Sequence, residues 1–154
     1  TSHESLVVAY QPTRFQLASE VGGRLLVLDT RRGQQRWQKD VSYQSRIVIN
    51  DRTVYAQGGA WDLLSGEKQT FEFSRSYGCG ILAGGRNLFV YRSATLGYFD
   101  LQGSRKNEDF GGIRPGCWIN ALPAGGLVLV PDGSTGCKCS YQNKTWIALR
   151  PDDR

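Results

Sequence analysis

The chain has 154 residues, the usual length of one domain. Its composition (40% hydrophobic, 11% aromatic and 21% charged) excludes a charge-rich disordered chain, because enough apolar surface is present to form a core. The net charge of +5 is too small to indicate a nucleic-acid partner. No apolar run approaches the roughly 18 residues of a transmembrane helix, so no transmembrane segment is predicted.

Short apolar segments alternate with turn dipeptides from one end of the chain to the other. No stretch of eleven or more residues combines a helical apolar pattern with helix caps. This arrangement is typical of an antiparallel all-β fold. The predicted strands are, in chain order, 6–10, 24–28, 46–49, 53–56, 87–91, 96–99, 126–130 and 145–149.

Three segments repeat the order strand, Asp, turn, Gly, strand. The Asp side chain can accept hydrogen bonds from the backbone N–H groups of the turn, and the Gly supplies a positive φ. The first two copies lie 33 residues apart and the third follows 38 residues later. The residues predicted to shape these turns are Asp29 and Gly33, Asp62 and Gly66, and Asp100 and Gly103.

A second feature keeps a similar spacing. Gly78-Cys79 and Gly116-Cys117 are also 38 residues apart, and each precedes a glycine-containing turn and an apolar strand. A unit of 33 to 40 residues is typical of one four-stranded propeller blade. We therefore expect about four antiparallel blades of a β-propeller, at 1–40, 41–75, 76–113 and 114–154. An ordinary β-sandwich is the alternative.

The repeat resembles a known family. The segment 27–37 matches Ala-x-Asp-x-x-Thr-Gly-Lys-x-x-Trp, the motif of the pyrroloquinoline-quinone-like (quinoprotein-type) β-propeller repeat, at Asp29, Gly33 and Trp37. The segment 60–70 matches the same motif at Ala60, Asp62 and Gly66, with Ser65 in place of Thr and Thr70 in place of Trp. In that family the Trp packs between neighbouring blades, so the resemblance implies that Trp37 is a buried wedge.

The resemblance also has implications for the whole protein. Propellers of the family close with more blades, commonly seven or eight, so other segments or a second chain are expected to complete a partial ring. The stretch 110–126 resembles the C-terminal region of large bacterial proteins that carry such repeats. The chain also opens without an initiator Met or a signal segment, as expected for a piece of a longer protein.

Four cysteines are candidate disulfide or metal-binding residues: Cys79, Cys117, Cys137 and Cys139. Their even number favours disulfides in an oxidising compartment. A tetrahedral thiolate metal site is a second interpretation, although Cys-x-Cys is a weaker signal than paired Cys-x-x-Cys. Thiols that pack as small hydrophobic groups are a third.

The family name raises the question of a cofactor. The resemblance implies that a quinone would stack between a Trp and a ring formed by two adjacent cysteines, with a calcium ion nearby. This sequence has no Cys-Cys pair, so we expect no cofactor, with pyrroloquinoline quinone or a thiolate-bound metal as alternatives. Arg114, Trp118 and Asn120 are candidate ligand-binding residues at a propeller mouth, suited to an anionic or sugar-like ligand.

No catalytic motif is recognisable, and the single histidine, His3, lies near one end of the sequence. The predicted function is therefore a non-catalytic scaffold module that binds a ligand or a protein. The alternative is a fragment of a quinone- or metal-dependent oxidoreductase whose other catalytic residues lie outside this chain. The resemblance and the cysteines together imply a periplasmic, cell-surface or secreted protein.

Overall fold

The computed structural model describes residues 2–10, 23–41, 43, 46–76, 78–133 and 141–152. Regular structure in these residues consists of β-strands alone, which confirms the predicted all-β fold class. Among the residues that the structure describes, no helix is long and apolar enough to cross a membrane.

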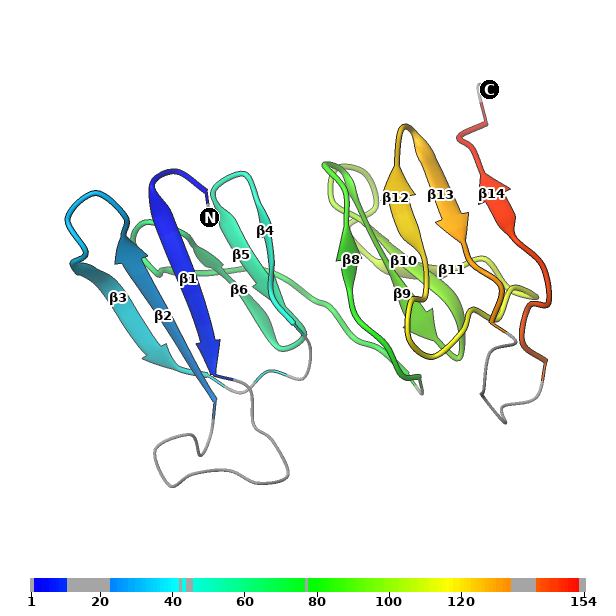
Figure 1. Cartoon of the computed structure of the whole chain (residues 1–154), viewed down its shortest axis with the longest axis horizontal. Coiled ribbons are helices and arrows are strands. Elements are labelled where there is room, and N and C mark those ends of the chain that lie inside the picture. Colours follow the sequence, from blue (N-terminus) through cyan, green and yellow to red (C-terminus); the bar gives the residue numbers. More distant parts are fainter. Residues whose placement is uncertain are drawn as a thin grey trace. The chain divides into compact units, whose positions relative to one another are not determined.

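The strands form four separate antiparallel sheets, and in each sheet neighbouring strands follow one another along the chain (Figure 1). The first sheet contains β1 (Ser5–Tyr10), β2 (Arg24–Asp29) and β3 (Gln35–Asp40). The second contains β4 (Val48–Asn50), β5 (Thr53–Ala56), β6 (Gly59–Asp62) and β7 (Lys68–Gln69). The third contains β8 (Ala83–Gly84), β9 (Leu88–Ser93), β10 (Thr95–Asp100) and β11 (Asn107–Asp109). The fourth contains β12 (Leu122–Ala124), β13 (Leu127–Val130) and β14 (Ile147–Leu149).

Such a sheet, in which strands pair in chain order, has the topology of a propeller blade. The second and third sheets have four strands, whereas the first and fourth have three within the described residues. The chain divides into two compact units. The first unit, Thr1–Glu72, holds the first and second sheets, and the second unit, Phe73–Arg154, holds the third and fourth.

The core of the first unit lies between its two sheets. Along β2, Leu25 and Val27 are fully buried and the residues between and after them are only partly buried, as expected for a strand with alternating faces. These side chains pack in one cluster with Val54 and Trp61 of the second sheet. Burial of this cluster therefore joins the two sheets into one unit.

The aromatic ring of Trp37 is almost entirely buried in this core. It is 7% exposed, and its indole N–H donates a hydrogen bond to the carbonyl of Leu63 at 2.9 Å. A Cβ on Gly66 would lie 2.8 Å from the Trp37 ring. Trp37 of the first sheet thus packs against the turn that leads from β6 to β7 in the second.

The turns that carry the repeated Asp residues are closed by the carboxylates. Asp29 accepts hydrogen bonds from the backbone N–H groups of Arg31 and Arg32 at 2.9 and 3.0 Å. These bonds, first that of Arg32, lower the pKa of Asp29. Asp62 accepts from Leu64 and Ser65 in the same way, at 2.9 and 2.8 Å.

Glycine is favoured in these turns either by a positive φ or by the space next to the Asp carboxylate. Gly33 and Gly66 have φ values of +66° and +74°, in the region that favours glycine. In the third copy the spacing is one residue shorter, and Gly103 donates its own N–H to Asp100 at 2.9 Å. A Cβ on Gly103 would clash with the Asp100 carboxylate, so this position needs glycine for space.

The core of the second unit also lies between two sheets. Val90 and Leu96 of the third sheet are fully buried and pack in one cluster with Val128 and Val130 of the fourth. In the fourth sheet Val128 pairs with Leu149, and both belong to the face that meets the third sheet. The two sheets of this unit therefore pack face to face.

Candidate functional site

Two cysteine-containing loops of the second unit meet at the buried amide of Asn120. The Asn120 Nδ2 group donates to the carbonyl of Gly116 at 2.7 Å and to that of Cys79 at 3.1 Å. Its Oδ1 accepts a hydrogen bond from the backbone N–H of Arg92 at 3.0 Å. One side chain thus links the loop before β8, the loop before β12 and strand β9.

Arg92 lies at the centre of this cluster. It occupies β9 and is fully buried, which is rare for arginine. Its Nη1 donates a hydrogen bond to Sγ of Cys117 at 2.9 Å. A Cβ on Gly78 would lie 2.8 Å from the Arg92 carbonyl oxygen and 2.9 Å from its Cγ, so the first cysteine loop packs closely on this residue.

A second arginine holds the first cysteine loop. Arg75 donates from Nη2 to the carbonyl of Gly78 at 2.7 Å and from Nη1 to that of Gly80 at 3.1 Å. Burial lowers the pKa of Arg75, the nearby Cys79 thiol opposes this, and the like charge of Arg92 lowers the pKa further. The loop around Cys79 therefore rests against two guanidinium groups.

Two of the four cysteines lie in the part of the chain that the structure describes. Cys79, which is exposed, and Cys117, which is half-buried, are both thiols. Cys137 and Cys139 lie outside the described residues. In the described part of the chain, no group of three or more His, Cys, Asp or Glu side chains is arranged to hold a metal ion. A disulfide between Cys79 and Cys117, or a metal site that includes the other pair, stays a prediction.

The candidate ligand-binding residues lie in different environments. Asn120 is 1% exposed, and its amide is engaged in the contacts described above. Trp118 is 83% exposed, on the loop between Cys117 and Asn120. Arg114 is half-buried, and its backbone N–H donates to Oδ1 of Asn143 at 3.2 Å. Asn120 is thus joined to the cysteine loops, whereas no hydrogen bond described here joins Arg114 or Trp118 to that cluster.

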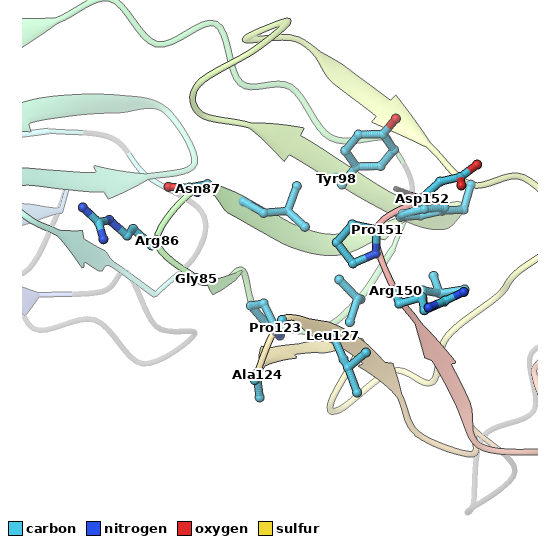
Figure 2. Close-up of a pocket in the computed structure, with 16 residues that line it drawn as sticks. Gly85, Arg86, Asn87, Tyr98, Pro123, Ala124, Leu127, Arg150, Pro151 and Asp152 are labelled. Carbon is cyan, nitrogen blue, oxygen red and sulfur yellow. The ribbon is translucent and has the colours of Figure 1, made fainter. Parts of the chain in front are cut away.

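A groove of about 720 Å³ opens on the surface of the second unit (Figure 2). It lies between the third and fourth sheets, where the β8–β9 and β12–β13 turns and the residues after β14 surround it. Its lining is mainly apolar. The apolar side chains include Leu88, Tyr98, Phe110, Pro123, Leu127 and Leu149.

Close contacts give the groove its shape. A Cβ on Gly85 would lie 3.2 Å from Cβ of Pro123, so glycine lets the β8–β9 turn approach β12. The rings of Tyr98 and Phe110 lie 4.7 Å apart between centroids, at an angle of 41°. The Tyr98 hydroxyl donates to Glu108 at 2.6 Å, and this bond raises the pKa of Tyr98 to about 12. Tyr98 is therefore neutral and fixed at neutral pH.

The groove has charged residues around its apolar lining. Arg150 brings a guanidinium group and Asp152 a carboxylate, whereas the Arg86 side chain points away from the other labelled residues of the groove (Figure 2). All three residues are exposed. The groove thus combines an apolar lining with a cation at its rim, a combination suited to an apolar ligand that carries an acidic group.

Sequence reasoning did not single out Arg92 or the groove. Arginine is mostly a surface residue, and nothing in the local pattern of β9 distinguishes Arg92 from an exposed one. The groove is formed by turns from two sheets, so no single segment signals it. The one available signal was the glycine pairs at 84–85 and 125–126, which mark turns that both line the groove.

Comparison with known proteins assigns no family to this chain. No family model matches the chain, and no curated protein matches it. Among solved structures it is similar to "The crystal structure of BamB from Moraxella catarrhalis", with a TM-score of 0.46 and 14% sequence identity. The match covers 71% of this chain and 40% of that one.

Proposed function

We propose that this chain is a non-catalytic protein-binding module. The groove of the second unit takes an apolar, extended segment of a partner protein that carries an acidic residue. The apolar lining of the groove is the observation that carries the proposal. Burial of apolar side chains drives most protein association, and a groove of this size accepts several side chains of a peptide.

The charges around the groove define the partner further. Arg150, at the rim of the groove, favours a carboxylate on the bound segment. Arginine suits this role because its guanidinium can bind a carboxylate through two parallel hydrogen bonds. The expected ligand is therefore a short run of apolar residues next to Asp or Glu.

Selection from a random peptide library displayed on phage, followed by fluorescence anisotropy with a synthetic peptide of the consensus, tests this function. We expect an apolar consensus with an acidic residue. Phe110→Ala, which removes a ring from the groove, should weaken binding by about tenfold or more. Tyr10→Ala is the matched control, since Tyr10 is 38% and Phe110 40% exposed and Tyr10 belongs to the first unit.

The affinities of the two variants show whether the peptide binds in the groove. Loss of affinity in Phe110→Ala with unchanged affinity in Tyr10→Ala supports the groove as the binding site. Equal affinity of both variants and the parent chain places binding elsewhere and contradicts the proposal. So does a library that yields no apolar consensus.

The outer faces of the first and fourth sheets carry apolar side chains, which bear on how this chain associates with other chains. In the first sheet Leu6 pairs with Leu28 and Val8 with Leu26, on the face opposite the buried Leu25 and Val27. In the fourth sheet Leu122 pairs with Leu129, and Leu129 with Ala148, opposite the core residues of that unit. Leu6 and Leu122 are 40% and 42% exposed.

Two apolar sheet faces in one chain suit contact with further sheets of the same kind. We propose that the four sheets are blades of a partial propeller and that a second copy of this chain covers these faces. Light scattering after size-exclusion chromatography should give twice the chain mass, and Leu129→Lys, which places a charge on the outer face, should give monomers. A monomeric parent chain would contradict the second copy and favour other polypeptide segments.

The remaining expectations belong to the same proposal. A binding module of this kind is expected in the periplasm, on the cell surface or outside the cell, where small disulfides and oxidised cysteines are common. The resemblance to pyrroloquinoline-quinone-like repeats supports the architecture of the proposal, and the missing adjacent cysteine pair favours a module without the quinone.

A further inference from the structure

We infer that Cys117 is a thiolate stabilised by Arg92, and that it is a site of thiol–disulfide exchange with small disulfides. The inference starts from the charge of Arg92, which stays protonated at any pH at which proteins fold. A fully buried cation is costly unless an anionic or polar partner accompanies it. Sγ of Cys117 lies 2.9 Å from Nη1 of Arg92 and can supply that negative charge.

The same contact changes the chemistry of the thiol. An adjacent cation stabilises the thiolate relative to the thiol, and the thiolate is the nucleophilic form. The backbone of Arg92 is held by Asn120, and its side chain packs on Gly78. The guanidinium is therefore fixed beside the sulfur and does not depend on a flexible surface side chain.

The two cysteines of the cluster differ in this respect. Arg75 lies near Cys79 and interacts with it electrostatically, but it donates its described hydrogen bonds to the carbonyls of Gly78 and Gly80 and not to the sulfur. Arg92 donates to the sulfur of Cys117. Cys79 is the more exposed of the two cysteines. If exposure decided reactivity, Cys79 would react faster; if stabilisation by a cation decides it, Cys117 reacts faster. This difference makes Cys79 an internal reference.

Other charged side chains surround the loops. Arg75 and Arg114 add positive charge, since Arg75 binds the first loop and Arg114 lies two residues before Gly116. Asp132 adds negative charge from the segment next to Gly133, which packs on Gly116. Cations thus exceed carboxylates among these described neighbours. Cys117 is half-buried, and the reaction requires that a small reagent reach its sulfur.

The reaction is an exchange of one sulfur–sulfur bond. The Cys117 thiolate attacks one sulfur of a small disulfide, the bond between the two sulfurs of that disulfide breaks, and the leaving thiolate takes a proton from water. The product carries a mixed disulfide at Cys117. The small disulfide is the oxidant, since one of its sulfurs leaves as a thiol while Cys117 becomes part of a disulfide.

Alkylation of the whole, reduced chain by iodoacetamide from pH 5.5 to 9.5, followed by peptide mass analysis that reports each cysteine separately, tests the inference. At pH 6.5 an ordinary thiol is only about 1% ionised, so we expect Cys117 to react about tenfold faster than Cys79. The rate at Cys117 should reach half its maximum at least one pH unit below the pKa of an unperturbed thiol, which is about 8.5. Glutathione disulfide at pH 6.5 should add one glutathionyl group, at Cys117.

Two variants sharpen the test. Arg92→Met removes the charge and should bring the pH profile of Cys117 to that of an ordinary thiol, whereas Cys79→Ser should leave the Cys117 profile unchanged. If Arg92→Met does not fold, the comparison of Cys117 with Cys79 in the parent chain still decides. Equal rates at the two cysteines at pH 6.5, or a glutathionyl group at another cysteine, would overturn the inference.

Discussion

The two units of this chain use the same blade topology for different purposes. The first unit buries Trp37 and Trp61 between its sheets and closes its turns with Asp29 and Asp62. The second unit has Asp100 in an equivalent turn, but it also buries a charged side chain, gathers two cysteine loops and opens a groove. The comparison shows that similar packing and turn chemistry form the sheets of both units, whereas the groove and the cysteine loops belong to the second unit.

Glycine explains part of the difference between the units. In the first unit the glycine at the Asp-containing turn makes room for an aromatic ring, as Gly66 does for Trp37. In the second unit Gly78 makes room for Arg92, and Gly80 makes room for the Asn120 amide. Glycine thus admits an apolar core group at a turn of the first unit and a polar network at the loop before β8 in the second.

The largest expected effect concerns the core of the first unit. Trp37→Ala removes a buried ring and the hydrogen bond to Leu63, and should lower the free energy of unfolding by about 3–5 kcal/mol. Trp146→Ala in the second unit is the control, since Trp146 is 70% exposed and its loss should change stability by less than about 0.5 kcal/mol. Urea denaturation measures both, and equal losses would show that Trp37 is not the wedge described here.

A smaller effect separates two equivalent turns within the first unit. Both Gly33→Ala and Gly66→Ala place a side chain at positive φ, which costs about 1 kcal/mol. A Cβ at position 33 meets nothing within 4 Å, whereas at position 66 it meets the Trp37 ring, which adds about 1–3 kcal/mol of overpacking. Urea denaturation should therefore rank Gly66→Ala as the more destabilising, and the reverse order would contradict the packing.

The smallest expected effect is the response of the turns to acid. Hydrogen bonds from Gly103 and then Gln102 lower the pKa of Asp100, and the hydroxyls of Ser104 and then Tyr98 lower the pKa of Glu108. Groups with lowered folded-state pKa values stabilise the protein above their unfolded values, near pH 4, and lose this effect as the pH falls through the folded values. Stability should be flat from about pH 7 to 5 and should fall below about pH 4.

The substitution Asp100→Asn tests whether Asp100 contributes to the loss of stability in acid. Asp100→Asn keeps an acceptor oxygen for the turn N–H groups but removes the titrating carboxyl, so its stability should fall less steeply below pH 4 than that of the parent chain. Thermal unfolding followed by circular dichroism at pH 3.5 and pH 6 gives the comparison. An identical acid dependence in both proteins would show that Asp100 does not contribute.

Sequence patterns predicted the central strands of the sheets well. Segments 24–28, 53–56 and 96–99 lie within or coincide with β2, β5 and β10, because their apolar residues alternate or cluster as a packed strand requires. The central strand β6 lay outside the predicted ranges. The edge strands β3 and β11 were expected only as strands that follow the turn glycines, without bounds. They are rich in polar residues, such as the Gln35–Asp40 segment, and their pairing depends on the neighbouring strand more than on their own pattern.

The cysteine cluster was harder to predict than the strands, because its main contact joins residues that lie far apart in the chain. The spacing of Cys79 and Cys117 indicated equivalent positions, and the structure brings both loops to Asn120. The partner that gives Cys117 its chemistry is Arg92, which lies 25 residues away in the chain and is buried against the usual preference of arginine. Only the packing of two sheets reveals that contact.

The central claim is that the groove of the second unit binds an apolar, acidic segment of a partner protein. Titration of the isotope-labelled chain with the selected peptide, followed by amide NMR chemical shifts, tests it most directly. The account predicts shifts at Leu88, Phe110, Leu127 and Arg150, which line the groove, and unchanged resonances in the β1–β3 sheet of the first unit. Shifts confined to the first unit would contradict it.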